Sequence, residues 1–365
     1  MNSRQRLLAA LDRRTPDRLP VTTHHLMPSF LSAFGGLSEL QFFDRFELDA
    51  IHWVSDQTDN TADPGNGWRV EREDIPDPDR RTMRYHINTP RGTLSTVLQD
   101  DGRTAWVRER LIKKKEDIEL IARFAPVPQC DVEQVNREGT AFGDRGIVRG
   151  AVPGFPIYGQ PGCWQDAAVL FGIEALILAT FEDPVWVAEF LSILQRRKLA
   201  WLQSAHGARF DLLELGGGDA SSTVISPDIF DRFVAPFDAP LIAAAHDAGL
   251  RVVYHTCGGM MPILERIAGM GPDAMETFTP PSMGGDADLR EAKRRIGERI
   301  CMIGGFDQFH HFIGCTPEET RLAVRRCFEE AGADGGYILA PSDHFFEAEE
   351  SLLRAFAAEA KSCIY

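Results

Sequence analysis

The sequence predicts an α/β fold, a TIM (β/α)8 barrel, and two observations carry this prediction. In the C-terminal half, short apolar runs alternate with helical patterns through five consecutive β–α units. These runs are continuously apolar, as expected for parallel strands that are covered on both faces. A doubly wound open sheet is the rival architecture, but no G-x-G-x-x-G turn follows any early strand of this sequence.

Eight strands are expected, the first three of them in the N-terminal half. Their ranges are 18–22, 49–54, 146–152, 210–215, 251–255, 273–278, 299–304 and 336–339. Helical patterns cover 167–181, 184–206, 226–246, 261–270, 286–296, 316–330 and 347–361. Two of these helices have clear start signals. Ser226-Pro227 supplies an N-cap and a first-turn proline, and Thr316 is followed three residues later by Glu319.

The segment 56–124 interrupts the β–α rhythm. It contains strand-like runs at 68–72, 83–88 and 92–98, separated by Pro76-Asp77-Pro78-Asp79 and closed by Asp100-Asp101-Gly102. This is the turn chemistry of antiparallel strands. We therefore expect a β-rich insertion between strands two and three, packed over one end of the barrel. The chain 1–365 is expected to form a single barrel domain that contains this insertion.

The composition excludes several classes of function. The formal net charge is -15 and no long basic run is present, which argues against a general nucleic-acid binder. The N-terminus has no apolar signal-peptide core, and no run approaches the roughly 18 apolar residues that a membrane span needs. The 7 cysteines are scattered and odd in number, which favours reduced thiols. We expect a cytoplasmic enzyme that needs neither nucleic acid nor membrane.

The active sites of TIM barrels lie at the C-terminal ends of the strands, and this rule selects the candidate residues. The polar residues at or just after the predicted strand ends include His24, His25, Glu214, Asp219, His255, Cys257, Glu276, Asp343 and His344. This end of the barrel collects metal-capable side chains and almost no Lys or Arg. Such a composition suits a cation site and does not suit a phosphate site.

The strongest pair is His255 and Cys257, which lie two residues apart at the end of strand five and so point to the same side. Imidazole and thiolate are zinc ligands, and a catalytic zinc site keeps one position open. Asp343 and His344 are the leading candidates for the third ligand, followed by Glu214. The alternative interpretation is a buried histidine beside a small hydrophobic cysteine, with Asp343 as a turn residue and Glu214 as a structural carboxylate.

Three further residues are candidates for catalysis. His24 or Glu276 would orient the substrate or supply a proton, and Asp219 would stabilise a protonated intermediate. Adjacent residues of a strand point to opposite sides, so only one of His24 and His25 can face the site. The alternative interpretation is that one of the two is exposed and the other is bonded to the backbone.

Residues of two loops are assigned to binding a cofactor or its carrier. Tyr158 belongs to an irregular loop after strand three that is expected to line the mouth of the barrel. Phe309 and His310 belong to a loop between Phe306 and Phe312. This aromatic loop suits an apolar or planar partner, and packing on the barrel rim explains it equally well.

Six runs of the sequence carry a family resemblance. They are 3–11 (SRQRLLAAL), 15–21 (TPDRLPV), 88–94 (NTPRGTL), 225–227 (ISP), 255–258 (HTCG) and 335–341 (GGYILAP). With them the chain resembles the uroporphyrinogen decarboxylase superfamily, and more closely its corrinoid-dependent methyltransferase branch. The resemblance implies a TIM barrel, in agreement with the strand count.

The resemblance to the methyltransferase branch also implies a chemistry. In that branch the His and Cys of H-x-C bind zinc with a later Cys near the last strand, so His255 and Cys257 match. The later region reads Ser342-Asp343-His344 here and departs from the pattern at the third ligand. The implied reaction moves a methyl group between a corrinoid (cobalamin-type) cofactor on a partner protein and a small methylated substrate, such as a methyl ether, or a thiol acceptor.

We therefore expect a zinc-dependent and corrinoid-dependent methyltransferase of the demethylase type. The alternative is a decarboxylase-like lyase that acts without metal on a small acid. The decarboxylase proper holds its acidic substrate with an arginine-rich N-terminal loop, whereas the run 22–28 reads TTHHLMP and has no arginine. A third interpretation is a non-catalytic barrel that binds a tetrapyrrole or its carrier protein.

Overall fold

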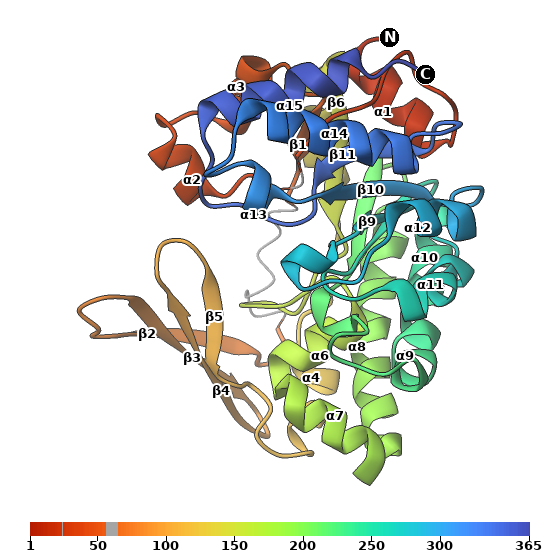
Figure 1. Cartoon of the computed structure of the whole chain (residues 1–365). Coiled ribbons are helices and arrows are strands. Elements are labelled where there is room, and N and C mark those ends of the chain that lie inside the picture. Colours follow the sequence, from red (N-terminus) through yellow and green to blue (C-terminus); the bar gives the residue numbers. More distant parts are fainter. Residues whose placement is uncertain (24, 56–64) are drawn as a thin grey trace.

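Seven parallel strands form a curled sheet with helices on its outside (Figure 1). The computed structural model describes residues 1–23, 25–55 and 65–365. The strands, in spatial order, are β1 (Ala50–Trp53), β6 (Gly146–Ala151), β7 (Leu212–Gly216), β8 (Val252–His255), β9 (Ala274–Thr277), β10 (Cys301–Phe306) and β11 (Tyr337–Pro341). Each lies within one or two residues of its predicted range, and the predicted TIM-type α/β fold is confirmed.

The eighth strand position is filled by a much shorter element than predicted. Within the predicted strand 18–22, Val21 alone forms a bridge, parallel to Leu339 of β11. The Thr22 amide donates to Leu339 O at 2.9 Å, and the Asp49 amide donates to Val21 O at 2.7 Å. The segment therefore lies between β11 and the start of β1. A longer strand cannot form because Pro20 has no N–H to donate.

The helices surround the sheet, and the N- and C-terminal ends lie close together at the top of Figure 1. The first group is α1 (Ser3–Leu11), α2 (Pro28–Ala33), α3 (Glu39–Phe46), α4 (Asp117–Phe124), α5 (Val132–Phe142), α6 (Cys163–Phe171), α7 (Ile173–Glu182) and α8 (Pro184–Ser204). The second group is α9 (Pro227–Phe233), α10 (Ala235–Asp247), α11 (Leu264–Met270), α12 (Leu289–Ile296), α13 (Gln308–His311), α14 (Pro317–Ala331) and α15 (Glu350–Ser362). These helices bury the outer faces of the strands.

Two predicted helices are each broken in two, which corrects the prediction. The range 167–181 holds α6 and α7, which turn at Gly172 with φ +103°, a left-handed conformation that ends a helix. The range 226–246 holds α9 and α10, because Pro236 lacks the N–H that would continue the helix. Among the described residues, no single helix has the length and apolarity to cross a membrane, although α6 and α7 together, bent by 106°, meet that test.

The β-rich insertion between the second and third barrel strands is also confirmed. It is a four-stranded antiparallel sheet, in the order β2 (Arg69–Ile75), β3 (Arg81–Thr89), β4 (Gly92–Asp100) and β5 (Ala105–Glu109). Figure 1 shows it projecting from the barrel at lower left. Strand β5 was not predicted, because its sequence AWVRE is short and lacks a clear alternation. The first part of the predicted insertion, 56–64, lies outside the described residues.

A buried carboxylate holds the closing segment in place. The Asp49 side chain is fully buried and accepts hydrogen bonds from Arg6 Nη1 at 2.6 Å and from the Val21 amide at 3.0 Å. Arg6 also binds Asp17, whose side chain is 39% exposed. Asp49 thus ties α1, the closing segment and β1 to one point. A charge buried in this way is costly if its partner is removed.

Substitution Asp49→Asn should therefore lower the free energy of unfolding by about 3–5 kcal/mol, since it leaves the buried Arg6 charge without its buried partner. Chemical denaturation followed by circular dichroism measures this loss. The matched control is Asp17→Asn, which removes the exposed partner of the same arginine and should cost at most about 1 kcal/mol. Equal losses for the two variants would contradict this account of barrel closure.

Candidate functional site

A cavity of about 590 Å³ opens at the C-terminal ends of the barrel strands. Its lining residues are His25, Trp53, Gln160, Pro161, Gln165, Glu214, Gly216, Gly217, Gly218, Asp219, His255, Cys257, Asp343 and His344. The predicted site residues that it brings together are Glu214, Asp219, His255, Cys257, Asp343 and His344. No Lys or Arg appears among the described residues that line it. The cavity is therefore polar, with an excess of carboxylates and imidazoles.

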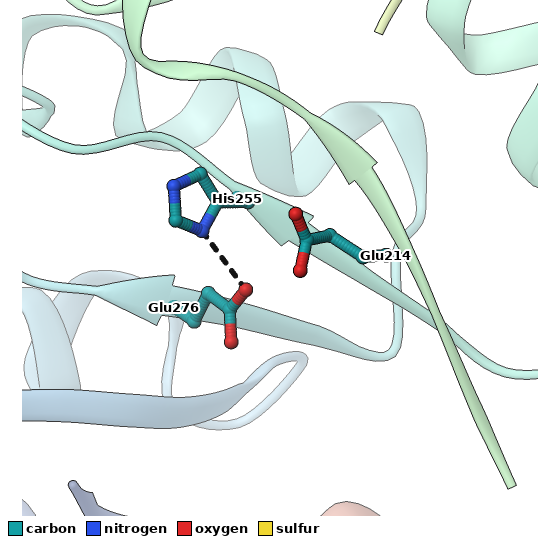
Figure 2. Close-up of side chains that lie close together, drawn as sticks. All are labelled: Glu214, His255 and Glu276. Atoms are coloured by element: carbon teal, nitrogen blue, oxygen red, sulfur yellow. Dashed lines mark hydrogen bonds and ion pairs between the residues drawn. The ribbon is translucent and has the colours of Figure 1, made fainter. Parts of the chain in front are cut away.

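His255 and Cys257 reach this cavity from the end of β8. Strand β8 ends at His255, and both side chains line the cavity wall. The imidazole is 9% exposed, and its Nδ1 donates to Glu276 Oε1 at 3.0 Å (Figure 2). A carboxylate that holds Nδ1 fixes both the ring orientation and the tautomer, so Nε2 is the nitrogen suited to ligate a metal.

The surroundings of His255 favour its protonated form. Burial alone would lower the pKa of His255, but the hydrogen bonds with Cys257 and Glu276 and the charges of Glu214 and Glu276 outweigh burial. Together they raise its pKa well above the ordinary 6.5. The metal-ligand atoms of Glu214, His255 and Glu276 all lie within 4.8 Å of one another. This environment attracts a cation, whether a proton or a metal ion.

An arginine that the strand-end rule missed lies beneath these residues. Arg149 of β6 is 1% exposed, and its Nη1 and Nη2 donate to the two oxygens of Glu276 at 2.8 and 2.5 Å. Its Nη2 also donates to Glu214 Oε2 at 2.7 Å. The guanidinium stacks over the Trp53 ring, 4.5 Å from the centroid. Arg149 therefore neutralises part of the charge of two carboxylates at the base of the cavity.

The glycine run 216–218 permits the close approach of β7 and β8. A Cβ at Gly216 would lie 2.4 Å from His255 O, and one at Gly218 would lie 2.7 Å from Cys257 Sγ. Gly216 also has φ +101°, which side chains other than glycine rarely adopt. The sequence signal was the Gly216-Gly217-Gly218 run itself, which marks a strand end and here also makes room for the H-x-C residues.

A second wall of the cavity is formed by two imidazoles and an indole. Asp343 Oδ1 accepts from the His344 amide at 2.7 Å and lies 2.9 Å from its Nδ1. The rings of His344 and His25 lie 5.5 Å apart, and those of His25 and Trp53 lie 5.3 Å apart. Burial alone would raise the pKa of Asp343, but His344 and the charge of His255 lower it. Asp343 is thus an ionised carboxylate close to His255.

A third wall carries Asp219, held by a residue that was not predicted. Gln165 Nε2 donates to Asp219 Oδ2 at 2.9 Å, and the Asp219 amide donates to Gln165 Oε1 at 2.6 Å. Trp164 Nε1 donates to Asp219 O at 3.0 Å. Gln165 lies on α6, far from any predicted strand end, so strand positions gave no signal for it. Gln165 therefore fixes both the carboxylate and the backbone amide of Asp219.

Other predicted site residues lie elsewhere. Glu276 is 2% exposed and sits behind His255 without lining the cavity. Tyr158 donates from its hydroxyl to Ala105 O of β5 at 2.7 Å, so it joins its loop to the insertion sheet. Phe309 is 55% exposed, and His310 Nδ1 bonds Asp307; neither lines the cavity. His24 lies outside the described residues, and its neighbour His25 lines the cavity.

The aromatic loop after β10 packs on the barrel rim, as the alternative interpretation held. Phe306 and Phe312 are 0% and 1% exposed, and their rings lie 5.1 Å apart. Phe356 of α15 lies 4.6 Å from Phe306, and Phe345 lies 5.1 Å from Phe312. These rings form a hydrophobic cluster, and none of them lines the cavity. They therefore support no inference about a planar substrate.

Comparison with known proteins adds a family and a fold neighbour. The model of the uroporphyrinogen decarboxylase (URO-D) family matches residues 112–355. Uroporphyrinogen decarboxylases from three strains of Neisseria meningitidis are each 29% identical over 125 residues, which is 33% of this chain and 32% of theirs. The alignment thus spans about a third of the length of these relatives. A methyltransferase from Methanosarcina mazei superposes with a TM-score of 0.66 at 16% identity, covering 99% of both chains.

Glu276→Gln should lower the pKa of His255 in the metal-free protein, because it removes the negative charge that stabilises the imidazolium. An NMR titration of the histidine side chains measures this. A raised pKa stabilises the fold below pH 6.5, and this stability is lost as the pH rises through the folded value. The Glu276→Gln variant should therefore lose less stability than the wild type as the pH rises. Glu265→Gln on α11, a surface control, should leave the His255 titration unchanged.

Proposed function

The chain belongs to the uroporphyrinogen decarboxylase family, and on that premise we propose that it is a zinc-dependent methyltransferase. It would move a methyl group between a small methylated substrate, or a thiol acceptor, and a corrinoid carried by a partner protein. One observation carries the proposal. His255 and Cys257 line the same cavity, and the buried carboxylate of Glu276 binds His255 Nδ1, which leaves Nε2 for a metal. The fold likeness to a protein described as a methyltransferase supports it.

The residue types present suit a zinc ion, although the ligand atoms that already converge within 4.8 Å are those of Glu214, His255 and Glu276. Imidazole and thiolate are preferred zinc ligands, and the His255–Glu276 bond is the outer support that ligating histidines commonly have. Asp343 lies near enough to His255 for its pKa to respond to that residue. It is our choice for the third ligand, with His344 next to it as the alternative. Bound zinc would act as a Lewis acid on a methylated oxygen or sulfur, or hold an acceptor thiol as its thiolate.

Glu214 is the weaker candidate for a ligand, although it lines the cavity. Its Oε2 already accepts from Arg149, a buried cation that shares the same carboxylate cluster. A second cation on that carboxylate would lie close to the guanidinium, and like charges repel strongly in a buried site. We therefore assign Glu214 and Glu276 to orientation and charge balance, and place the metal on the Cys257 side of His255.

The protein's own groups have defined tasks in this proposal. Glu276 fixes the tautomer of His255, and Arg149 keeps Glu276 ionised while it does so. The rings of Trp53, His25 and His344 supply apolar and amphipathic wall next to the reacting methyl group. The cavity opens at the strand ends, where the corrinoid of the partner protein would meet the substrate. The protein would act by positioning and by electrostatics.

A metal-free lyase is the second candidate, because the curated relatives are decarboxylases. The charge of the cavity disfavours it for an acidic substrate. The lining carries carboxylates and, among its described residues, no Lys or Arg to bind the acid groups. Turnover of a small acid that survives strong chelators and needs no corrinoid would support the lyase and overturn the methyltransferase.

The purified protein should contain about one zinc per chain, measured by elemental analysis. Cys257→Ser and His255→Ala should each lose most of this zinc and reduce methyl transfer to a corrinoid protein by about 100-fold or more, since each removes a ligand. The control is Cys315→Ser, which changes a thiol in the loop before α14 and outside the cavity lining. Full methyl transfer by the Cys257→Ser variant would contradict the proposal.

The third ligand is identified by a pair of isosteric variants. Asp343→Asn should weaken zinc binding about 10–100-fold, because it replaces an anionic ligand by a neutral amide. Glu214→Gln should weaken it less, because Glu214 is already bonded to Arg149. Competition with a fluorescent zinc chelator measures both affinities. The reverse order of the two effects would move the metal to the Arg149 side of His255.

A further inference from the structure

We propose that the substrate of this cavity carries a positively charged ammonium group, and that Asp219 is the counter-ion that selects it. The inference rests on the proposed function, because it names the substrate class of the same site. The reacting methyl group, or the acceptor thiol, would lie at the Cys257 end of the cavity. The ammonium group would lie against Asp219, on a separate part of the same small molecule.

Among the described residues no cation is hydrogen-bonded or ion-paired to the carboxylate of Asp219, and the charge of Arg110 acts on it only from a distance. Its Oδ2 accepts a hydrogen bond from the neutral side-chain amide of Gln165, at 2.9 Å. Every other carboxylate of the cavity is bonded to a basic group: Glu214 to Arg149, and Asp343 to His344. Burial raises the pKa of Asp219, and the hydrogen bond from Gln165 and the distant charge of Arg110 do not offset this effect. A cationic ligand group would supply the missing partner.

Asp219 is also held rigidly before any ligand arrives. The Asp219 amide, its Oδ2 and its carbonyl oxygen are each engaged, the first two by Gln165 and the third by Trp164. A Cβ at Gly217 would lie 2.4 Å from Gln165 Cγ, so the glycine makes room for this arrangement. Preorganised groups lose little conformational freedom when a ligand binds, so they discriminate well. Of the two carboxylate oxygens of Asp219, Oδ2 is bonded to Gln165 and Oδ1 is not.

The total charge of the site points in the same direction. Of the four carboxylates Glu214, Glu276, Asp219 and Asp343, the first two share one bonded arginine, Arg149, and Arg110 acts on Asp219 only from a distance. Zinc held by His255, Cys257 thiolate and Asp343 would form a neutral unit, leaving Glu214, Glu276 and Asp219 against Arg149. Without zinc, a protonated His255 lowers the excess of negative charge but does not remove it. In both states an anionic group is repelled and a cationic group is attracted.

Three methyl thioethers of nearly equal size test the inference by isothermal titration calorimetry at pH 7 and low salt. They are methylthioethylamine (a cation), methylthioethanol (neutral) and methylthiopropionate (an anion). The zinc-loaded wild type should bind the amine at least about 10-fold more tightly than the alcohol, and the propionate most weakly. Asp219→Asn should remove the preference for the amine, a change of about 1.4 kcal/mol for each factor of ten.

Two further variants distinguish a loss of selectivity for the amine from a general loss of ligand binding. Gln165→Ala should weaken binding of the amine more than binding of the alcohol, because it releases the Asp219 carboxylate as well as enlarging the cavity that Gln165 lines. Asp228→Asn, an exposed acidic residue of α9, should change neither. An unchanged melting temperature shows that the Asp219→Asn variant is folded. Equal binding of the amine and the alcohol by the wild type, a preference that survives in Asp219→Asn, or no binding of the amine would overturn the inference.

The failure of this inference and that of the proposed function give different results. Stoichiometric zinc and methyl transfer without any charge preference would refute the role of Asp219 alone. A charge preference in a protein that binds no zinc and transfers no methyl group would refute the methyltransferase alone. The binding measurements are made with and without added zinc and need neither a corrinoid partner nor turnover, so each result is obtained independently.

Discussion

The contact of Arg149 with Glu276 is the constraint on which the site depends. The two residues lie on β6 and β9, three strands apart in the sheet, which in a flat sheet would separate them by roughly 14 Å. Their side chains meet at 2.8 Å because the sheet is curled and they cross its interior. The ion pair thus needs the barrel, and it stabilises the carboxylate that orients His255. Two carboxylates this close without a cation would not both stay ionised.

Most of the barrel could be predicted from the sequence because its signals are local. Continuous apolar runs gave the seven sheet strands, and the turn residues of 76–79 and 100–102 gave the insertion. The errors occurred where a tertiary contact decides the outcome. The first strand is reduced to one bridge because Pro20 has no N–H to donate and the Leu19 amide donates to Cys363 O, at the other end of the chain. The break between α9 and α10 has a local signal, because Pro236 has no N–H to continue the helix.

The residues of the candidate site also fall into those that the sequence predicts and those that depend on tertiary contacts. Residues at strand ends were found, since the barrel itself brings them together. Arg149 was missed because it lies within a strand and points inward, where an apolar residue is the usual occupant. Gln165 was missed because it reaches Asp219 from a helix that the strand-end rule does not consider. The aromatic loop shows the opposite error, because its composition suited a ligand while Phe306 and Phe312 belong to the hydrophobic core and Phe309 is exposed away from the cavity.

Under the proposed function, the separation of charges in the cavity would let one small site hold a metal and still select a charged substrate. Arg149 occupies the Glu214 and Glu276 side of His255, so a second cation is directed to the Cys257 and Asp343 side. Asp343 in place of the second thiolate of the family pattern keeps the charge of the proposed ligand set the same. The negative charge of Asp219 is then not consumed by the metal. It is left to act on the substrate, at a point fixed by Gln165.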